Sequence, residues 1–584
     1  MVTEMATASK QATKTGTRMI VAAIDIGTTY SGWAYSTLTE PEKIYANQAW
    51  FADGGSLASL KTASCILFTP EKEFKHFGYE AETSFASLAE DDEHWGWYYF
   101  RRFKMLLNEN HKLNRYTTIE DISGKKMPAL VIFANAIKFL KDNFFATIRK
   151  RVTNITDTDV IYVLTVPAIW DDMAKRFMRD AAVEAGISND QLIIALEPEA
   201  ASIWCQELQT EFQRSDDENV LGISAIGTRY MVVDLGGGTA DITVHERRPN
   251  NTLLEIHKPI GGPWGGTEVD KNFTKLLKRI FGSVEWERFE QNDLEDLLHI
   301  YRDFEAKKRN CHLNSSDQVT LKVPSSLKEY YEENDKKTTA EIEKKFDKHI
   351  TWKKDKLRIE ASVLEKCFET PINKIVSTVR EVLSKKKLRN VSRIILVGGF
   401  AESIYVQDRF KANFADKQII IPPDCGLAVL KGAVLFGHNP SIVTARIARY
   451  SYGLDIAVPF DHTKHPKEKM VDSNIGKFCL NTFWKAVEIG QQVEDGYVVS
   501  RIGKAVDDFQ RKLVLNVVKS TQNDPLFTTD KGCEVIGEIV VPMDCTLKAD
   551  DNAVEEMFIF GGTELRFQAK HITRGDTHVL NIDL

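Results

Sequence analysis

Apolar runs and amphipathic stretches alternate along the first three quarters of the chain. Four apolar runs have the length and β-branched content of buried strands: Ile20–Gly27, Asp159–Pro167, Tyr230–Gly238 and Arg393–Gly399. The stretches between them predict helices; Asp171–Gly186, for example, opens with acidic residues and ends at glycine, as helix-end chemistry favours. This alternation predicts an α/β architecture in which helices cover the sheets.

The pattern changes over the last quarter of the chain. Short apolar runs such as Lys512–Ser520, separated by polar turns, predict a β-rich module over residues 446–584. The polar, Thr-rich residues 1–17 predict a disordered leader, which leaves 18–445 as the α/β region. Within that region, residues 325–354 are dense in charges of both signs and predict a solvated helical insertion or loop.

Composition excludes several classes of protein. With 43% hydrophobic and 27% charged residues and a net charge of −7, the chain of 584 residues has no overall positive field to attract nucleic acid. No run approaches the ~20 apolar residues of a membrane span. The eight cysteines form no CxxC pair, and no export signal is present, so we expect reduced thiols in a cytoplasmic protein. The neighbours Cys311 and His312 have no further ligands nearby in sequence and predict no metal site.

Two segments share one design. The first, Asp25–Gly32, reads DIGTTYSG, and the second, Asp234–Asp241, reads DLGGGTAD; each follows an apolar strand and precedes another. Glycine in such a turn permits positive φ and lets backbone N–H groups approach an anion closely. The aspartate at each strand end would repel a phosphate unless a hydrated Mg²⁺ lay between them. The pair therefore predicts two lobes that hold the phosphates of a nucleotide.

Three further segments fit the same site. Glu197 stands at a strand-to-helix junction with proline next to it, where its carboxylate could hold a metal-bound water or simply favour the helix dipole. Glu305, Lys308 and Arg309 share one side of a predicted helix and could line a nucleoside pocket, although such a set is often a solvated face. The pair Gly398 and Gly399 lets the backbone pass close to a flat ligand.

These segments, in this order, resemble the nucleotide-binding domain of the 70 kDa heat-shock chaperones, within the actin and sugar-kinase superfamily. DIGTTYSG resembles the first phosphate loop, DLGGGTAD the second and ILVGGFAES the adenosine motif, over most of residues 18–440. C-terminal phrases such as FGGTELRF resemble the divergent branch called heat shock 70 kDa protein 12. The resemblance implies an actin-like ATPase domain of two α/β lobes (a duplicated ribonuclease-H-like fold), followed by a β-rich module.

The resemblance also implies a role for each matching residue. Asp25, Asp234 and Glu197 would organise a hydrated Mg²⁺, while Thr239 and Asp241 would join Glu197 and Asp234 in hydrolysis, with Asp241 positioning the attacking water. The residues implied to bind ATP or ADP are Gly27, Thr28, Thr29, Tyr30, Gly236, Gly237, Gly238, Gly265, Gly266, Glu305, Lys308, Arg309, Gly398, Gly399 and Asp424.

The chain departs from the family pattern at four places. Glu82 aligns with a lysine of the family, no other lysine stands nearby in a convincing context, and a carboxylate there predicts slow hydrolysis that Glu82→Lys should speed. Glu402 aligns with the arginine that stacks on the base. The linker, Val443–Arg449, carries two arginines instead of a leucine run. We also expect no helical lid after the β-rich module.

These features leave three functions open. The first is an ATP-binding, chaperone-like protein with weak hydrolysis, whose β-rich module binds an unidentified protein or peptide under nucleotide control. The second is a scaffold or signalling adaptor that ATP closes without useful hydrolysis. The third is a small-molecule kinase, such as a sugar kinase, for which a β-rich module of this size would be unexpected. No reading involves nucleic acid or a membrane span, and the oligomeric state stays open.

Overall fold

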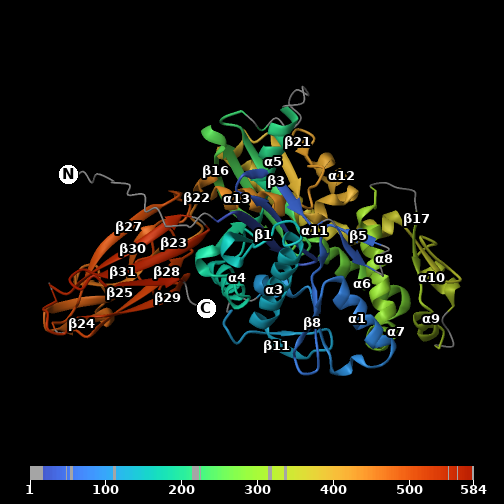
Figure 1. The fold of residues 1–584 in the computed structure, drawn as a ribbon, viewed down its shortest axis with the longest axis horizontal. Coiled ribbons are helices and arrows are strands. Elements are labelled where there is room, and N and C mark those ends of the chain that lie inside the picture. Colours follow the sequence, from blue (N-terminus) through green and yellow to red (C-terminus); the bar gives the residue numbers. More distant parts are fainter. Residues whose placement is uncertain are drawn as a thin grey trace.

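The structure is a computed structural model that describes residues 18–47, 49–52, 57–109, 113–213, 223, 225–312, 318–333, 338–508, 510–549, 551–561 and 563–581. The leader predicted over residues 1–17 lies outside the described residues. A large α/β body holds most of the chain, and a β-rich module projects from one side of it (Figure 1). The predicted architecture of an α/β region followed by a β-rich region is thus confirmed.

The first sheet, in the part of the body we call lobe I, is built around β1 (Ile20–Ile26). This strand pairs antiparallel with β2 (Tyr30–Thr37), which in turn pairs with β3 (Glu40–Ala46). On its other side β1 pairs parallel with β12 (Val160–Val166), which pairs parallel with β13 (Leu192–Leu196). Every residue of β1 is buried, because helices cover the parallel part of the sheet on both faces.

The second sheet, in lobe II, repeats this order. Here β14 (Arg229–Leu235) pairs antiparallel with β15 (Ala240–Arg247), which pairs with β16 (Leu253–Gly262). On the other side β14 pairs parallel with β20 (Arg393–Val397), and β20 with β21 (Gln418–Ile420). The two lobes therefore share one topology, and each places a turn between its first two strands at the same end of its sheet.

Two helices join the lobes. Helices α5 (Glu197–Gln213) and α13 (Ala428–His438) pack on each other between the sheets and share a core with both of them. A methyl group added at Gly432 would lie 1.7 Å from the backbone oxygen of Ala200, so only glycine permits this crossing. The outer faces are covered in lobe I by α3 (Ala129–Ile148) and α4 (Asp172–Glu184), and in lobe II by α6 (Gly266–Phe281), α8 (Leu294–Arg309), α11 (Ala361–Ser384) and α12 (Ile404–Asn413).

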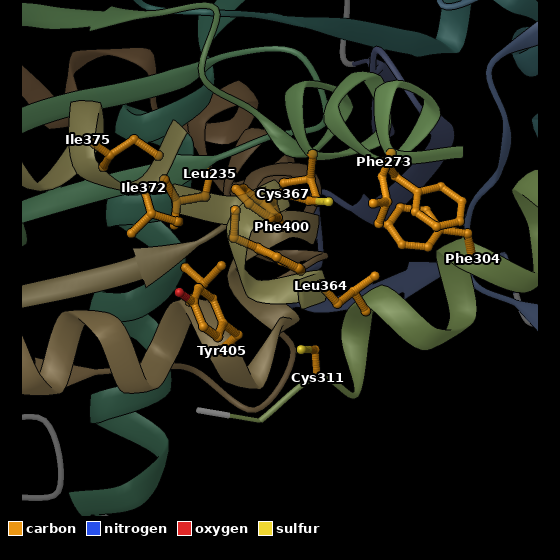
Figure 2. Close-up of a cluster of buried hydrophobic side chains, with 14 of the residues drawn as sticks. Leu235, Phe273, Phe304, Cys311, Leu364, Cys367, Ile372, Ile375, Phe400 and Tyr405 are labelled. Carbon is orange, nitrogen blue, oxygen red and sulfur yellow. The ribbon is translucent and has the colours of Figure 1, made fainter. Parts of the chain in front are cut away.

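The core of lobe II reaches the space between the lobes. Phe273 of α6 stacks on Phe304 of α8, with 3.7 Å between the ring centroids (Figure 2). Phe400 packs against Phe368 in the same cluster and is 5% exposed. Because Phe400 follows Gly399 directly, the glycine pair after β20 is held against a rigid apolar core.

The charged segment at 325–354 is helical in part, as predicted, but it is not wholly solvated. It contains α9 (Ser325–Glu332), α10 (Thr339–Lys345) and β18 (Ile350–Lys353), and β18 pairs with β19 (Lys356–Glu360). Its apolar positions are buried in the lobe II core, so the described part is a packed subdomain and not a solvated loop. The buried residues are Leu327, Tyr331, Ile342, Ile350 and Trp352.

The β-rich module consists of two antiparallel sheets. Leu454, Val517, Phe558 and Phe567 are among the residues that form a core of their own there. One sheet has the order β24-β25-β23-β28-β29 and the other β27-β30-β31-β32. The strands are β23 (Ser451–Pro459), β24 (Met470–Ser473), β25 (Gly476–Val487), β27 (Tyr497–Lys504), β28 (Lys512–Ser520), β29 (Cys533–Pro542), β30 (Ala553–Gly561), β31 (Glu564–His571) and β32 (Thr577–Asn581).

The predicted boundary at 445/446 falls inside a strand of lobe II. This strand, β22 (Val443–Ile447), pairs parallel with β16 and antiparallel with β26 (Gln492–Glu494), a strand from the later part of the chain. The linker therefore contributes an inner strand to the lobe II sheet, and β26 forms the edge of that sheet. All eight cysteines are free thiols, and none of the described helices is long and apolar enough to cross a membrane.

Candidate functional site

A cavity of about 340 Å³ lies between the two lobes. It is lined by both glycine-rich turns, by the start of α5, by the last turn of α8 and by the segment after β20. Asp241, Gly265 and Asp424 lie outside this lining. The predicted residues that line it are Asp25, Gly27, Thr28, Thr29, Tyr30, Glu197, Asp234, Gly236, Gly237, Gly238, Thr239, Gly266, Glu305, Lys308, Arg309, Gly398 and Gly399.

The two glycine-rich turns face each other closely. A methyl group added at Gly237 would lie 2.0 Å from the Thr29 hydroxyl, and one at Gly238 would lie 2.4 Å from the Thr28 hydroxyl. None of the glycines of these turns has positive φ, so the expectation that they serve backbone conformation was wrong. Close approach between the lobes is what requires glycine here. In the cavity lining, positive φ occurs at Gly398, where φ is 89°.

The start of α6 holds the second turn in place. The backbone N–H groups of Gly265, Gly266 and Thr267 donate to the carbonyls of Gly238, Gly236 and Gly237, at 3.1, 3.2 and 2.8 Å. A side chain at Gly265 would collide with two of these carbonyls. Gly265 therefore supports the turn from behind, while Gly266 reaches the cavity.

Four buried carboxylates gather at one end of the cleft. Asp25 and Asp234 are the last-but-one residues of β1 and β14, Glu197 begins α5, and Asp241, the second residue of β15, lies opposite Asp234. Asp241 accepts a hydrogen bond from the backbone N–H of Ile169 at 2.8 Å, which ties its carboxylate to the segment after β12. The repeated topology explains this meeting, because each lobe presents the same strand end to the other.

Burial and neighbouring charges shift the pKa values of these carboxylates in different directions. Burial, together with the charges of the neighbouring carboxylates, raises the pKa of Asp234 well above its usual range. Burial also raises the pKa of Glu197 to about 7, although Lys104 opposes the shift. For Asp25, burial pushes the pKa upward, but Lys61 and Lys104 outweigh burial and leave the pKa below its usual value. Negative charge is therefore in surplus at this end of the cleft.

Two lysines that the sequence analysis did not assign to the site lie among these carboxylates. Lys61 donates to Asp25 at 2.7 Å, and Lys104 donates to Glu197 at 2.6 Å. Both line the cavity, and the side chain of Lys104 is only 5% exposed. Their partners lie far away in the sequence, so no local motif reveals them, and Lys104 stands in FRRFKM, a stretch of mixed basic and apolar residues that gives no clear signal.

Glu82 lies elsewhere. It belongs to α1 (Tyr79–Glu90), is buried, and forms an ion pair with Arg302 of α8 at 3.2 Å, outside the cavity lining. The expectation that Glu82 places a carboxylate on the transferring phosphate was wrong, as was the expectation that no lysine stands nearby. Alignment of a five-residue stretch could not reveal that other segments bring cations into the cleft.

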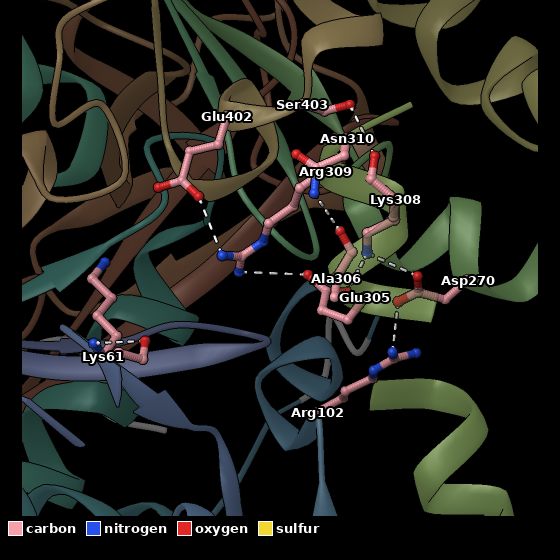
Figure 3. Close-up of polar contacts among 11 residues, drawn as sticks. Lys61, Arg102, Asp270, Glu305, Ala306, Lys308, Arg309, Asn310, Glu402 and Ser403 are labelled. Carbon is pink, nitrogen blue, oxygen red and sulfur yellow. Dashed lines mark hydrogen bonds and ion pairs between the residues drawn. The ribbon is translucent and has the colours of Figure 1, made fainter. Parts of the chain in front are cut away.

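The opposite end of the cleft carries the predicted nucleoside residues. Lys308 contacts both Glu305, at 2.6 Å, and Asp270, at 2.8 Å, and is 5% exposed (Figure 3). The Arg309 guanidinium lies over the Tyr30 ring, 5.4 Å from its centroid, and forms an ion pair with Glu402 at 3.5 Å. Glu402 thus lines the cleft at the position where the family places arginine, and Arg309 neutralises it.

Asp424 does not face the cavity. Its carboxylate accepts a hydrogen bond from Trp204 at 3.1 Å and forms an ion pair with Lys431. Two nearby residues, Gly426 and Leu427, line the cavity in its stead. The sequence motif therefore located the correct loop, but it could not give the direction of the side chain.

The linker and the β-rich module meet the lobes at a surface that we call the junction. Arg446 of β22 donates twice to Glu199 of α5, at 2.8 Å each, and the backbone N–H of Ile447 donates to Glu255 at 2.9 Å. From the module, Glu564 accepts from Arg179 of α4 at 2.7 Å, and Tyr452 donates to Asp172 at 2.9 Å. Arginine contacts and the buried side chains of Val443, Ala445 and Ile447 together hold the linker strand in place.

The donor set of the cleft fits a hydrated Mg²⁺. In the part of the chain that the structure describes, no three His, Cys, Asp or Glu side chains converge to ligate a metal ion directly. Mg²⁺ usually keeps several waters and needs only one or two carboxylates together with phosphate oxygens. The surplus of carboxylate charge at Asp25, Glu197 and Asp234 is what such an ion would compensate.

The chain is similar to known proteins over most of its length. Residues 101–458 match the family model described as "Hsp70 protein". The chain is 33% identical to heat shock 70 kDa protein 12A of Mus musculus, over 97% of this chain and 92% of that protein. It is 30% identical to heat shock 70 kDa protein 12B of Homo sapiens, over 97% and 91%. Identity is 28% to the chloroplastic stromal 70 kDa heat shock-related protein of Pisum sativum, over 57% and 41%.

Proposed function

The chain belongs to the Hsp70 family, and on that premise we propose that it binds ATP and ADP with Mg²⁺ in the cleft between its lobes. The observation that supports this most is that both glycine-rich turns, three of the four carboxylates and the last turn of α8 line one cavity. Large pockets with convergent polar groups and perturbed carboxylates are where ligands bind. We also interpret the repeated sheet order as a duplicated ribonuclease-H-like fold.

Each part of the cleft has a separate task in this proposal. The two turns, with Thr28, Thr29 and Thr239, hold the phosphates, and the last turn of α8 holds the nucleoside together with Gly398 and Gly399. When bound, Mg²⁺ would supply positive charge between the phosphates and Asp25, Glu197 and Asp234. Asp241, fixed by the N–H of Ile169, positions the attacking water.

Hydrolysis is proposed to be slow, for a reason other than Glu82. Lys61 and Lys104 each donate a hydrogen bond to a carboxylate, Asp25 or Glu197, which offsets part of the ammonium charge even when the remaining donors contact a phosphate. A cation that is already engaged stabilises a transition state less than a free one does. These two lysine–carboxylate contacts are therefore consistent with a slow ATPase cycle.

The β-rich module is the proposed partner-binding part. We propose that nucleotide changes how the module docks at the junction and thereby controls binding of a protein or peptide, as in a chaperone. The support is spatial: Glu197, in the cleft, and Glu199, which holds the linker arginine, both lie in the first turn of α5. A movement of this turn on nucleotide binding would reach both places.

A second candidate is a scaffold that nucleotide closes without useful hydrolysis. The observation in its favour is a pair of ion pairs, one holding the module against α4 and one holding the linker against α5, since these favour one stable assembled shape. Binding of a denatured peptide, measured with and without ATP, separates the two: nucleotide-dependent release favours the chaperone, and no peptide binding favours the scaffold. Transfer of labelled phosphate to a sugar would instead indicate a kinase.

Calorimetry tests the nucleotide proposal directly. ATP and ADP are titrated, with and without Mg²⁺, into the intact protein and into Asp25→Asn. We expect binding that depends on Mg²⁺ and weakens at least about 100-fold in Asp25→Asn, which corresponds to about 3 kcal/mol. Asp157→Asn is the matched control, because Asp157 pairs with Lys141 on lobe I outside the cleft. The proposal fails if neither nucleotide associates at millimolar concentration, or if Asp25→Asn binds as well as the control.

A further inference from the structure

We propose that Lys104 is a catalytic residue: it contacts the terminal phosphate of bound ATP and stabilises the charge that develops there during cleavage. The proposal rests on the proposed nucleotide function and concerns a role that the family pattern would place at position 82. In this chain Glu82 is turned to Arg302, outside the cavity lining.

The placement of Lys104 suits this role. Its ammonium group is buried in the wall of the cavity, 2.6 Å from Glu197 and 5.2 Å from the centre of the Trp170 ring. An ammonium group has three N–H donors, and among the described residues Glu197 is the hydrogen-bond acceptor that it reaches. Donors therefore remain for a ligand in the cavity. A buried lysine with spare donors at the edge of a cavity is poised for an anion.

Neighbouring charges show which end of the nucleotide Lys104 would meet. Burial raises the pKa of Asp241 and the charge of Lys104 opposes that shift, while Lys61 and Lys104 together lower the pKa of Asp25 against the effect of burial. The ammonium of Lys104 therefore lies near both carboxylates as well as 2.6 Å from Glu197. Asp25 leads into the first phosphate turn, and Asp241 is the residue proposed to position water. The ammonium group therefore lies where the terminal phosphoryl group and the attacking water would come together.

The segment that carries Lys104 is anchored to lobe II from both sides of the lysine. Arg102, in the left-handed region with φ of 56°, forms an ion pair with Asp270 of α6 at 2.6 Å, and Lys308 shares that carboxylate (Figure 3). On the other side, the Met105 sulfur lies against Gly238, where an added methyl group would be 2.5 Å from it. Lys104 thus belongs to lobe I in sequence, but the residues on both sides of it are held by contacts with lobe II.

The chemical step is balanced without any further reactant. The oxygen of a water forms a bond to the γ-phosphorus, while the bond from that phosphorus to the oxygen bridging the β- and γ-phosphates breaks; ADP and inorganic phosphate leave. The proton that the water loses passes to a cleft carboxylate and then to solvent. Lys104 loses no proton; its charge offsets the negative charge on the phosphoryl oxygens as they separate.

The alternative is that Lys104 only neutralises Glu197 and so stabilises the empty cleft. Both roles predict a loss of folding stability when the lysine is removed, so stability alone cannot decide between them. The difference lies in the response to a γ-phosphate mimic. A purely structural lysine affects ADP and ADP with beryllium fluoride equally, whereas a catalytic lysine affects the mimic more.

The experiment uses the full chain and four variants. Lys104→Met removes the charge, and Lys104→Arg retains it. Lys141→Met removes a lysine of lobe I that pairs with Asp157 outside the cleft, as a control for loss of an ion-paired lysine. Glu82→Lys tests the position that sequence alignment favoured. Affinities for ADP and for ADP with beryllium fluoride are measured by calorimetry with Mg²⁺, and single-turnover cleavage of labelled ATP is followed with protein in excess.

For Lys104→Met we expect cleavage to fall about 100-fold and affinity for the mimic to fall at least tenfold more than affinity for ADP. Lys104→Arg should recover part of both, and Lys141→Met and Glu82→Lys should cleave within about threefold of the unmodified protein. If Lys104→Met binds the mimic and cleaves ATP like Lys141→Met, Lys104 is not catalytic, although ADP binding leaves the proposed function intact. If cleavage by the unmodified protein is too slow to follow, the mimic decides alone. If the unmodified protein binds no ADP, the proposed function fails first.

Discussion

The cleft and the junction are both built from buried acidic and basic side chains, yet their charges are balanced differently. In the cleft, Asp25, Glu197, Asp234 and Asp241 face two lysines, Lys61 and Lys104. At the junction, carboxylates and cations are more nearly matched: Glu199, Asp172 and Glu564 pair with Arg446, Lys175 and Arg179, and Glu255 lies near Arg446 and Arg449.

This difference separates a binding site from a structural contact. A buried ion pair with good geometry compensates its own desolvation and leaves nothing for a ligand to supply. An excess of buried carboxylate is unfavourable by itself, and the raised pKa values of Asp234 and Glu197 report that penalty. The cleft therefore has an excess of carboxylate charge that a cation can stabilise, whereas most carboxylates of the junction already pair with a cation.

The largest effect is expected when one positive charge is removed from the junction. Arg446→Met removes a twofold donor and leaves Glu199, whose side chain is 1% exposed, as a buried charge without its main partner. Removing one member of a buried ion pair commonly costs about 3–5 kcal/mol. We expect the module to come away from the lobes, which small-angle scattering and protease cleavage near residue 446 would detect. If Arg446→Met stays as compact and resistant as the unmodified protein, the ion pair does not hold the junction.

A second variant should reduce the excess of carboxylate charge in the cleft. Asp234→Asn removes a carboxylate whose raised pKa makes its ionised form unfavourable in the folded protein. Stability lost to such a group grows as pH rises above its unfolded value, so the variant should be more stable than the unmodified protein, by about 1–2 kcal/mol near pH 8 and by less at pH 6. Urea unfolding at both pH values measures this, and nucleotide affinity should fall in the same variant. If Asp234→Asn is less stable than the unmodified protein, the cleft does not carry an unfavourable excess of carboxylate charge.

The junction should depend on pH through Glu255. Burial and the neighbouring Glu199 raise the pKa of Glu255 to about 7. When the linker leaves, the carboxylate regains its ordinary pKa, so docking is fully favourable below about pH 4 and weakens as pH rises through 7. Between pH 6 and pH 8 we expect about a tenfold rise in opening of β22, or about 1.4 kcal/mol. Hydrogen exchange of β22 measures it, and Glu255→Gln should flatten the dependence.

The smallest effect is expected at the nucleoside end. Glu402 and Arg309 form an ion pair in which each side chain is 41% exposed, and such pairs contribute about 0–1 kcal/mol. Glu402→Gln should change stability by less than that, and Glu402→Arg should change ADP affinity only a few-fold, because Arg309 already presents a guanidinium over Tyr30. A large loss of ADP binding in Glu402→Gln would show that this carboxylate contacts the nucleoside.

The sequence identified the backbone segments and carboxylates that line the cleft, but it did not reveal the two lysines among them. The phrases around Asp25 and Asp234 are local, since glycine, hydroxyl and aspartate act together within eight residues, and the structure brings both to one cavity. Lys104 and its partner Glu197 lie 93 positions apart, and Arg446 and Glu199 lie 247 apart. No local pattern records such pairs, because the fold alone decides which distant segments meet.

The same limit explains the errors at single positions. Asp424 stands in the expected loop, but its side chain turns to Trp204, a residue of a helix that sequence places elsewhere. The charged segment at 325–354 was predicted to be solvated because its charges are numerous; its few apolar residues nevertheless reach the lobe II core. Composition averages over a segment, whereas burial is decided residue by residue.

The contact at Gly432 has a mechanical consequence. At Gly432 the backbones of α13 and α5 approach each other with no side chain between them, and each helix lies against both sheets. We expect the two lobes to rotate about this close crossing instead of sliding past each other. A small rotation there would produce a larger displacement at the glycine-rich turns, which lie farther from the crossing. Gly432→Ala should force the two helices apart and widen the cleft.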